Sequence, residues 1–422
     1  MKKRIFAALL ALCLTALTGC DWSTADPEDI FGTLTDYYNV EQKKQDVKLT
    51  SFALPYLKGE TADPITCPDG AMQTLGALLY EGLFALDGQF EAQPALAESY
   101  TYDAARYTYT ITLRSGVTFS DGSAVTAQDV ANSLRRAQSS ARYSGRLAEV
   151  SDLWASGGAV RITLTGDNRS FVSRLDIPIV KSGTESSTFP TGTGPYAYSG
   201  EGGAHLAQNA SWWQGKSLPL ERIELTACKD TDSVSYAFYA REVQLLFCDL
   251  TGADDSSVYG SGDYTDTATT IMQYLCLNTR RAPFDDPAVR RAVTLGVDRA
   301  SCVSAYLLGH GLAAQFPVSP ASGLYPKDLE TAYSQDGYAS ALEAAGLNTG
   351  KTRSLTLLVN QESSFRVSTA QTIAAGLSRY DLQVTVRSLP YDEYVQALEP
   401  VSYTHLRAHE TCADLVCRLL LE

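Results

Sequence analysis

The stretch from 107 to 137 limits the possible folds of this chain most strongly, because within it the hydrophobic pattern changes from strand to helix. The segment YTYTITLRSG (107–116) alternates, with Tyr107, Tyr109 and Ile111 on one face and threonines on the other. Strict alternation predicts a half-buried strand, and the Ser-Gly pair predicts that the strand ends in a turn.

The residues that follow predict a second turn and then a capped helix. Asp121 and Gly122 form a pair that is common in hairpin turns, so we expect Asp121 to be a turn residue and not an acid in a reaction mechanism. Thr126, followed three residues later by Asp129, predicts a helix whose first turn is closed by a capping box. Apolar residues at helical spacing give that helix its predicted buried stripe: Val130, Leu134 and Ala137.

Strand and helix patterns continue along the chain, which indicates an α/β architecture. The segments 47–55 and 159–166 are predicted strands, and 71–87 has the apolar spacing of a helix. Asp286 followed by Pro287 predicts a helix start, in which the aspartate is the cap and the proline takes the first helical position.

A βαβ-like unit is predicted late in the chain. Residues 354–360 and 382–389 have the pattern of strands, and a helix is expected over 365–379 between them. The whole sequence has 422 residues, which is too long for one compact core, so we expect two or three domains.

Charge and motif content exclude several classes of function. The formal net charge is -14, whereas nucleic acid binding needs clustered Lys and Arg, so no nucleic acid partner is expected. The chain holds four histidines and lacks Gly-x-Ser-x-Gly, His-Glu-x-x-His and phosphate-loop motifs. These absences argue against an enzyme, and we expect no catalytic residues, no cofactor and no metal.

The N-terminus has the features of a bacterial lipoprotein leader. Three basic residues precede an apolar run over 5–17 that is short for a membrane span, and Leu17-Thr18-Gly19-Cys20 resembles a lipobox. We interpret 1–20 as a lipoprotein signal peptide that ends at the lipidated Cys20, and 21–46 as a polar tether. Two acyl chains would hold the protein on the extracytoplasmic face of the cell membrane. An ordinary secretory signal is the alternative.

Five further cysteines precede residue 400, and they are widely spaced: Cys67, Cys228, Cys248, Cys276 and Cys302. None belongs to a Cys-x-x-Cys pair, so no zinc or redox motif is indicated. A disulfide between Cys228 and Cys248 is one interpretation. Small buried hydrophobic side chains are the other, and we favour it.

Several motifs in order resemble the large extracytoplasmic solute-binding proteins of peptide and nickel ABC transporters, that is, family 5 of these proteins. They include PALAESY (94–100), LRSGVTFSDG (113–122) and VTAQDV (125–130). PTGTGPYAY (190–198) resembles a turn of that family, and YLCLNTRRAPFDDPAVRRAV (274–293) resembles its helix entry. The motifs are structural, and we expect their glycines to supply backbone angles that other residues resist: Gly122, Gly192 and Gly194.

The resemblance covers about 47–400 and implies a two-lobed periplasmic-binding-protein fold of class II, of the large cluster C type, with an extra inserted domain and a missing C-terminal part. It implies that 47–84 and 185–270 form lobe I, 85–184 the inserted domain and 271–400 an incomplete lobe II. It also implies a mechanism of hinge closure on a peptide, which is then delivered to ABC permease and ATPase subunits.

The same resemblance implies that two segments face the ligand, namely the loop after the first strand and the crossover strand near 274. Such segments offer main-chain groups to an extended peptide, in the manner of strand addition. Core packing is the alternative for Tyr274 and Cys276, and Cys276 stands where relatives have a carboxylate. The candidate ligand-binding residues are Thr66, Pro68, Asp69, Gly70, Tyr274, Cys276 and Asn278.

Two alternatives remain open within this fold. One is a binder of nickel, a metal chelate or another small solute, and the other is a surface peptide receptor that has lost transport. A metal-chelate binder would need Arg or His around a small anionic group. His310, in LLGHGL, is expected to be a loop residue that follows a helix.

Residues 401–422 do not continue the family pattern. VSYTHLRAHET (401–411) matches the translation of a transposase sequencing adapter, and DLVCRLLLE (414–422) matches its continuation after a short index. We interpret this segment as adapter-derived, and we expect it to form no consistent part of the fold. The alternative is a metal-binding tail with His405, His409, Cys412 and Cys417, which the adapter match disfavours.

Overall fold

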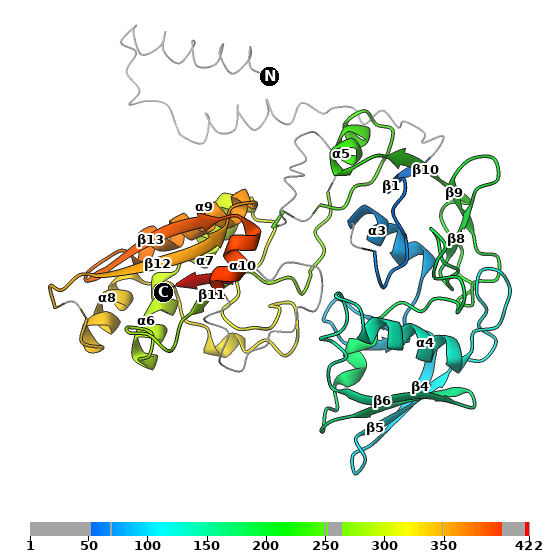
Figure 1. The fold of residues 1–422 in the computed structure, drawn as a ribbon, viewed down its shortest axis with the longest axis horizontal. Coiled ribbons are helices and arrows are strands. Elements are labelled where there is room, and N and C mark those ends of the chain that lie inside the picture. The colour runs from blue at the N-terminus through cyan, green and yellow to red at the C-terminus, as the bar shows by residue number, and fades with distance from the viewer. Residues whose placement is uncertain are drawn as a thin grey trace, which may run out of the picture. The chain divides into compact units, whose positions relative to one another are not determined.

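The structure is a computed structural model that describes residues 52–67, 70–248, 250–251, 264–347, 349–398 and 418–421. Helices and strands are mixed along these residues (Figure 1), which confirms the α/β class. The predicted leader with Cys20, the tether, Pro68 and Asp69 lie outside the described residues. Among the described helices, none combines the length and the apolar composition that a membrane span requires.

The first sheet has the strand order β1-β10-β9-β8. β1 and β10 are parallel, with Leu54 opposite Leu225, whereas β9 is antiparallel to both β10 and β8. Helices α3 and α5 both contact β1. The elements are β1 (Ala53–Leu57), α3 (Gly70–Leu79), β8 (Tyr196–Ser199), β9 (His205–Gln208), β10 (Arg222–Cys228) and α5 (Thr231–Tyr239).

The second sheet is antiparallel, with the order β4-β5-β7-β6, and helix α4 packs against β6 and β7. A two-stranded sheet of β2 and β3 precedes it in the chain. The elements are β2 (Phe84–Leu86), β3 (Ala92–Pro94), β4 (Ala97–Asp103), β5 (Thr108–Leu113), α4 (Ala127–Gln138), β6 (Val150–Ser156), β7 (Ala159–Leu164) and the 3₁₀ helix η2 (Phe171–Arg174). The domain boundaries given above stay predictions.

The alternation on β5 is confirmed, because Tyr109 and Ile111 are fully buried. Tyr107 is an exception to the predicted buried face. It lies in the turn before β5 with a φ of 52°, and 38% of its surface is exposed. The strand β5 therefore begins one residue later than the alternation indicates, at Thr108.

The capping box of α4 forms as predicted. The Asp129 amide donates to the Thr126 hydroxyl across 3.2 Å, and the Thr126 amide donates to the Asp129 carboxylate across 3.1 Å. Val130, Leu134 and Ala137 are all buried on the helix face that packs against the sheet.

The third sheet has the order β11-β14-β12-β13, and β12 and β13 are parallel. Helix α9 contacts both of them, so the βαβ unit is confirmed. The Asp286 carboxylate accepts the Ala288 amide across 2.7 Å and caps α6 as predicted. The elements are β11 (Tyr274–Leu277), α6 (Pro287–Gly296), α7 (Arg299–Tyr306), η3 (Lys327–Leu329), α8 (Gln335–Ala344), β12 (Arg353–Asn360), α9 (Ser364–Leu377), β13 (Leu382–Leu389), α10 (Tyr391–Leu398) and β14 (Arg418–Leu421).

The helix predicted over 71–87 is too long. Helix α3 ends at Leu79, and the chain then extends, so that Gly82 bridges to Pro178. A Cβ at Gly82 would lie 2.9 Å from the main chain of Asp176. This close approach between distant segments overrides the local helical pattern.

The predicted role of the glycines is right at one position and wrong at two. Gly122 has a φ of 82°, as a turn glycine should. Gly192 and Gly194 have no positive φ. Instead, a Cβ at Gly192 would lie 2.1 Å from the Leu79 carbonyl oxygen, and one at Gly194 would lie 2.5 Å from that of Leu78. These two glycines allow the main chain to pack against the end of α3.

We expected the tail 401–422 to form no consistent part of the fold, but its last four described residues pair with the third sheet. Residues 418–421 form β14, which pairs in parallel with β11 and antiparallel with β12. The main chain of this strand pairs with that of both neighbours. Residues 401–417 lie outside the described residues, and the adapter origin of the tail stays a prediction.

The cysteines favour the packing interpretation. Cys228 and Cys248 are thiols and are not joined in a disulfide. Cys67, Cys228 and Cys302 are buried among apolar side chains. Burial raises the pKa of the Cys228, Cys248 and Cys302 thiols, so these side chains remain protonated near neutral pH.

Candidate ligand-binding site

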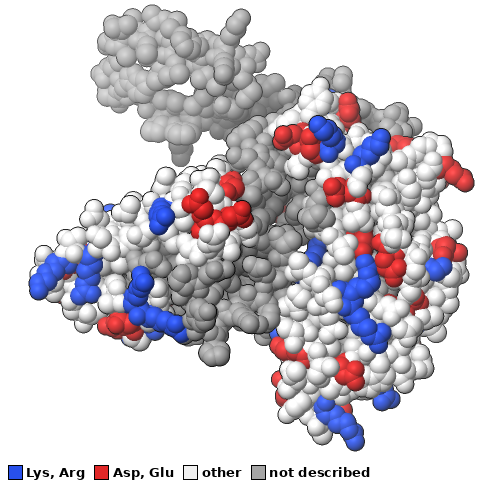
Figure 2. Space-filling model, in the orientation of Figure 1, with Lys and Arg blue, Asp and Glu red and all other residues white. Residues whose placement is uncertain are grey.

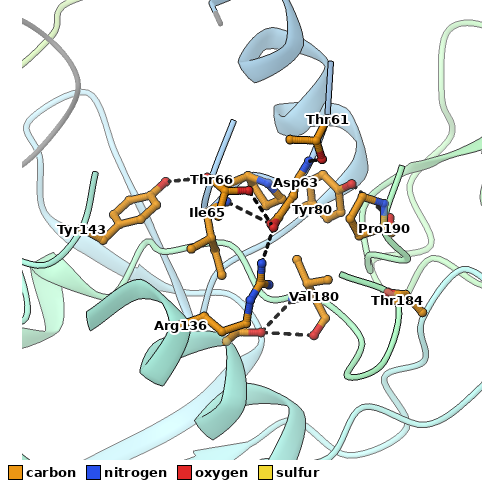
Figure 3. Close-up of polar contacts among 12 residues, drawn as sticks. Thr61, Asp63, Ile65, Thr66, Tyr80, Arg136, Tyr143, Val180, Thr184 and Pro190 are labelled. Atoms are coloured by element: carbon orange, nitrogen blue, oxygen red, sulfur yellow. Dashed lines mark hydrogen bonds and ion pairs between the residues drawn. The ribbon is translucent and has the colours of Figure 1, made fainter. Parts of the chain in front are cut away.

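The loop 61–67, between β1 and α3, is organised around the buried side chain of Asp63 (Figure 3). The Asp63 carboxylate accepts the amide of Ile65 across 3.2 Å and the hydroxyl of Thr66 across 3.0 Å. Its main-chain carbonyl accepts the amides of Thr66 and Cys67 across 3.2 and 2.8 Å. One residue that is 2% exposed therefore sets the conformation of the whole loop.

Arg136 supplies the charge that opposes Asp63. It lies in the last turn of α4, and its guanidinium forms an ion pair and hydrogen bond with the Asp63 carboxylate. A carboxylate this deeply buried requires a hydrogen-bonded partner of opposite charge. Tyr143, just beyond α4, donates from its hydroxyl to the Pro64 carbonyl across 3.4 Å. Helix α4 and the segment that follows it thus hold the loop after β1.

The segment 188–190 contacts a second side of the loop and is itself held by Tyr80. The Tyr80 hydroxyl donates to the Pro190 carbonyl across 3.0 Å, and the Ala62 amide donates to the Thr188 carbonyl across 2.7 Å. Burial raises the pKa of Tyr80 far above its ordinary value, and the nearby Asp63 carboxylate raises it further. Tyr80 is therefore a hydrogen-bond donor throughout the neutral pH range.

Two of the four candidate residues near the first strand can be placed. Thr66 is the exposed side chain of the loop, and Gly70 is the exposed first residue of α3. The structure brings them to the same loop and helix start. Their contact with a ligand stays a prediction.

The three candidate residues near β11 are at least partly buried, and two of them have contacts within the protein. Tyr274 and Cys276 are half-buried, and Cys276 packs against an apolar cluster on one face of the sheet (Leu358, Leu389 and Tyr394). Asn278 is 7% exposed, and its side-chain oxygen accepts the Arg280 amide across 3.1 Å in the turn after β11. These contacts favour core packing for Cys276 and a turn role for Asn278.

Sequence reasoning missed Arg136 and Tyr143 as parts of this site. The available signal was the position of Arg136, which directly precedes Ala137 on the buried stripe of α4. A charged side chain that is buried beside such a stripe is almost always paired. The acid itself is 73 positions away in the chain, so its identity could not be read from the helix.

The described residues contain no cluster of three or more His, Cys, Asp or Glu arranged as metal ligands. His310 follows α7 as a loop residue, as predicted, and its ring nitrogen lies 2.9 Å from the Asp266 carboxylate. On the face shown in Figure 2, Lys and Arg are interspersed with Asp and Glu over the described residues. The negative net charge is therefore not gathered in one patch on that face.

The fold is that of a two-lobed solute-binding protein, as the solved structures show. The chain is similar to the nickel ABC transporter of Bacillus halodurans, with a TM-score of 0.62 and 23% identity, covering 83% of this chain and 76% of that one. It is also similar to the substrate-binding protein CtaP of Listeria monocytogenes, with a TM-score of 0.60 and 18% identity, covering 88% and 78%. At these identities the similarity shows the fold alone.

The family follows from the sequence match. Residues 91–405 match the bacterial extracellular solute-binding proteins, family 5, and this chain belongs to that family. Membership agrees with the expectation of an extracytoplasmic binding protein and not an enzyme.

Curated relatives include glutathione-binding proteins. The chain is 27% identical over 294 residues to GsiB of Escherichia coli (strain K12), covering 65% of this chain and 55% of that protein. It is 28% identical over 298 residues to GsiB of Salmonella typhi, with the same coverage. The chain thus spans about half the length of the curated relatives that it matches.

Proposed function

We propose that this protein is the lipid-anchored substrate-binding component of an ABC importer and that it captures short peptides between two lobes by hinge closure. The observation that carries the proposal is the similarity to glutathione-binding proteins over 65% of the chain. Glutathione is itself a tripeptide. Its recognition elements, main-chain amides and carbonyls flanked by charged ends, are common to short peptides.

The partners follow from the same proposal. The loaded protein would deliver its ligand to permease and ATPase subunits, and Cys20 would tether it to the outer face of the membrane. Genes for two permeases and two ATPases beside this one would support transport. Their absence would favour the alternative of a surface peptide receptor.

Calorimetric titration of the complete native protein tests the ligand class. We expect binding of glutathione or trialanine, with recovery of the peptide unaltered after incubation, because a binding protein does no chemistry. A nickel-histidine complex is the competing ligand, since the fold is shared with nickel transporters. Binding of that complex without binding of either peptide would overturn the peptide proposal, and recovery of cleaved peptide would overturn the assignment as a non-enzyme.

A further inference from the structure

Helix α5 and the segment that follows it expose several large hydrophobic side chains. Tyr236 is 71% exposed and Phe247 is 54% exposed, whereas exposed hydrophobic side chains on a protein surface are usually scattered singly. The Glu242 amide donates to the Ala237 carbonyl across 2.8 Å, which holds the segment against the end of α5. We call the four exposed side chains within 236–247 the α5 patch: Tyr236, Tyr239, Leu245 and Phe247.

The α5 patch lies beside the start of β1. The Ala53 amide donates to the Gln244 side chain across 2.6 Å, and the Gln244 amide donates to the Ala53 carbonyl across 3.1 Å. Helix α5 also contacts β1. Leu245 follows Gln244 directly, and Phe247 is two residues further on. The patch is therefore next to the point where the chain enters the first sheet.

The chain that enters β1 comes from the predicted lipid anchor. About 30 residues separate Cys20 from Ala53, and a chain of this length reaches at most about 110 Å when it is fully extended. The start of β1 is thus the described part that the anchor would hold nearest to the lipid along the chain. Such a tether gives an effective concentration on the order of 1 mM. A weak contact is then enough to keep a surface at the membrane.

We propose that the α5 patch contacts the interfacial zone of the bilayer that carries the anchor. The inference rests on the proposed function, because it needs the lipid on Cys20. Tyrosine suits this zone, since it joins an apolar ring to a polar hydroxyl, and Leu and Phe side chains enter the boundary of the acyl chains. The contact would orient the first sheet toward the membrane, where permease subunits lie.

The charges around the α5 patch predict how the contact depends on the lipid. Residues 229–247 include three acidic and two basic side chains, whereas attraction to anionic lipid depends on clustered Lys and Arg. The contact therefore depends on the apolar side chains. We expect it to form on neutral phosphatidylcholine and to persist when the salt concentration is raised.

Hydroxyl-radical footprinting of the complete native protein, lipidated and anchored in phosphatidylcholine vesicles, tests the contact. We expect Tyr236 and Phe247 to be oxidised more slowly, by about threefold or more, than in the Cys20→Ala protein mixed with the same vesicles. Tyr100 on β4 is the internal control, because it is 43% exposed and its oxidation rate should not change. Equal oxidation rates of Tyr236 in the two proteins would overturn the inference.

A charge placed in the α5 patch gives a second test. In the lipidated Phe247→Asp protein, Tyr236 should be oxidised nearly as fast as in the Cys20→Ala protein, because burying an unpaired carboxylate in lipid is costly. Tyr391→Asp is the matched control, since Tyr391 is exposed on α10, and it should keep Tyr236 protected. Full protection of Tyr236 in Phe247→Asp would show that the membrane does not cover this surface.

The other outcomes separate this inference from the proposed function. Protection that appears only when permease subunits share the vesicle would mean that a protein covers the patch. Protection that disappears when the protein is diluted in lipid would mean that a second copy covers it. Either result overturns the inference and leaves the anchor intact. Mass spectrometry that finds no lipid on Cys20 would overturn the anchor and the inference together, whereas peptide capture is still decided by calorimetry.

Discussion

The indole N–H of Trp213 donates to the carboxylate of Glu81 across 2.8 Å, although 132 positions separate the two residues. Trp212 and Gln214 donate to the other oxygen of the same carboxylate across 3.2 and 3.1 Å. The guanidinium of Arg114 lies over the Trp213 ring, 4.5 Å from its centroid. One carboxylate thus anchors the segment that joins β9 to β10.

Glu81→Gln should weaken this anchor, because an N–H₂ group would replace one of the two oxygens that accept these donors. We expect the free energy of unfolding, measured by urea titration, to fall by about 1–3 kcal/mol. Glu98→Gln is the matched control, since Glu98 is exposed on β4. Equal unfolding midpoints for the two variants would show that Glu81 carries no structural role.

Gly194→Ala should destabilise the protein because the new Cβ would lie 2.5 Å from main-chain atoms of α3. Overpacking of this kind costs about 1–3 kcal/mol. Gly166→Ala is the control, because a Cβ there meets open space. Thermal unfolding of both variants checks the prediction, and a Gly194→Ala protein as stable as the wild type would contradict it.

Asp121 should stabilise the fold in a pH-dependent manner. The hydrogen bond from Lys181, and then that from Ser123, lower the pKa of Asp121 from 3.8 to about 2. Because the pKa of Asp121 is lowered in the folded state, its ionised carboxylate stabilises the fold above pH 4. This stabilisation is lost as the pH falls toward 2. The pair is partly exposed, so we expect no more than about 1 kcal/mol.

The measurement is the difference in free energy of unfolding between the wild type and Asp121→Asn at pH 6 and at pH 2.5. The difference should shrink at the lower pH. In a Lys181→Gln background it should be smaller at pH 6, because the largest cause of the pKa shift is gone. A difference that grows on acidification would refute the assignment.

Cys20→Ala should release the protein from the membrane fraction into the medium or periplasm, because the lipobox cysteine would carry both acyl chains. Cys13→Ala, which changes the apolar run of the leader, should leave the protein in the membrane fraction. Fractionation followed by immunoblotting reads out both variants. Retention of Cys20→Ala in the membrane would show that the leader is not a lipoprotein signal.

Sequencing of the locus in the source genome tests the origin of the tail. We expect the genomic reading frame to continue beyond residue 400 without encoding SYTHLRAHET. Unbroken genomic reads that encode this segment would make β14 a native strand and remove the adapter interpretation. The pairing of β14 with β11 and β12 would then be a native feature of the third sheet.

The elements that the sequence predicts correctly depend on residues within a few positions of each other. The capping box of Thr126 and Asp129 and the cap at Asp286 form because each donor and acceptor belong to the same helix start. The alternation of β5 and the βαβ unit of β12, α9 and β13 are likewise local patterns.

The features that the sequence could not predict depend on contacts between distant segments. Helix α3 stops where it does because Gly82 approaches Asp176, and Gly192 is needed because it packs on Leu79. The same limit applies to the candidate site. The loop was located by resemblance, but Arg136 became visible only when the fold placed α4 beside Asp63.

The parallel pairing of β1 with β10 has a consequence for biosynthesis. Leu54 pairs with Leu225, about 170 residues later in the chain. At a synthesis rate of 5–20 residues per second, about 10–30 s pass between the synthesis of β1 and that of its partner strand β10. During that time the antiparallel second sheet and α4 can already close, because they lie between the two strands in the sequence. The first sheet is therefore the later one to assemble on the nascent chain, and β1 is the segment that a chaperone would need to shield.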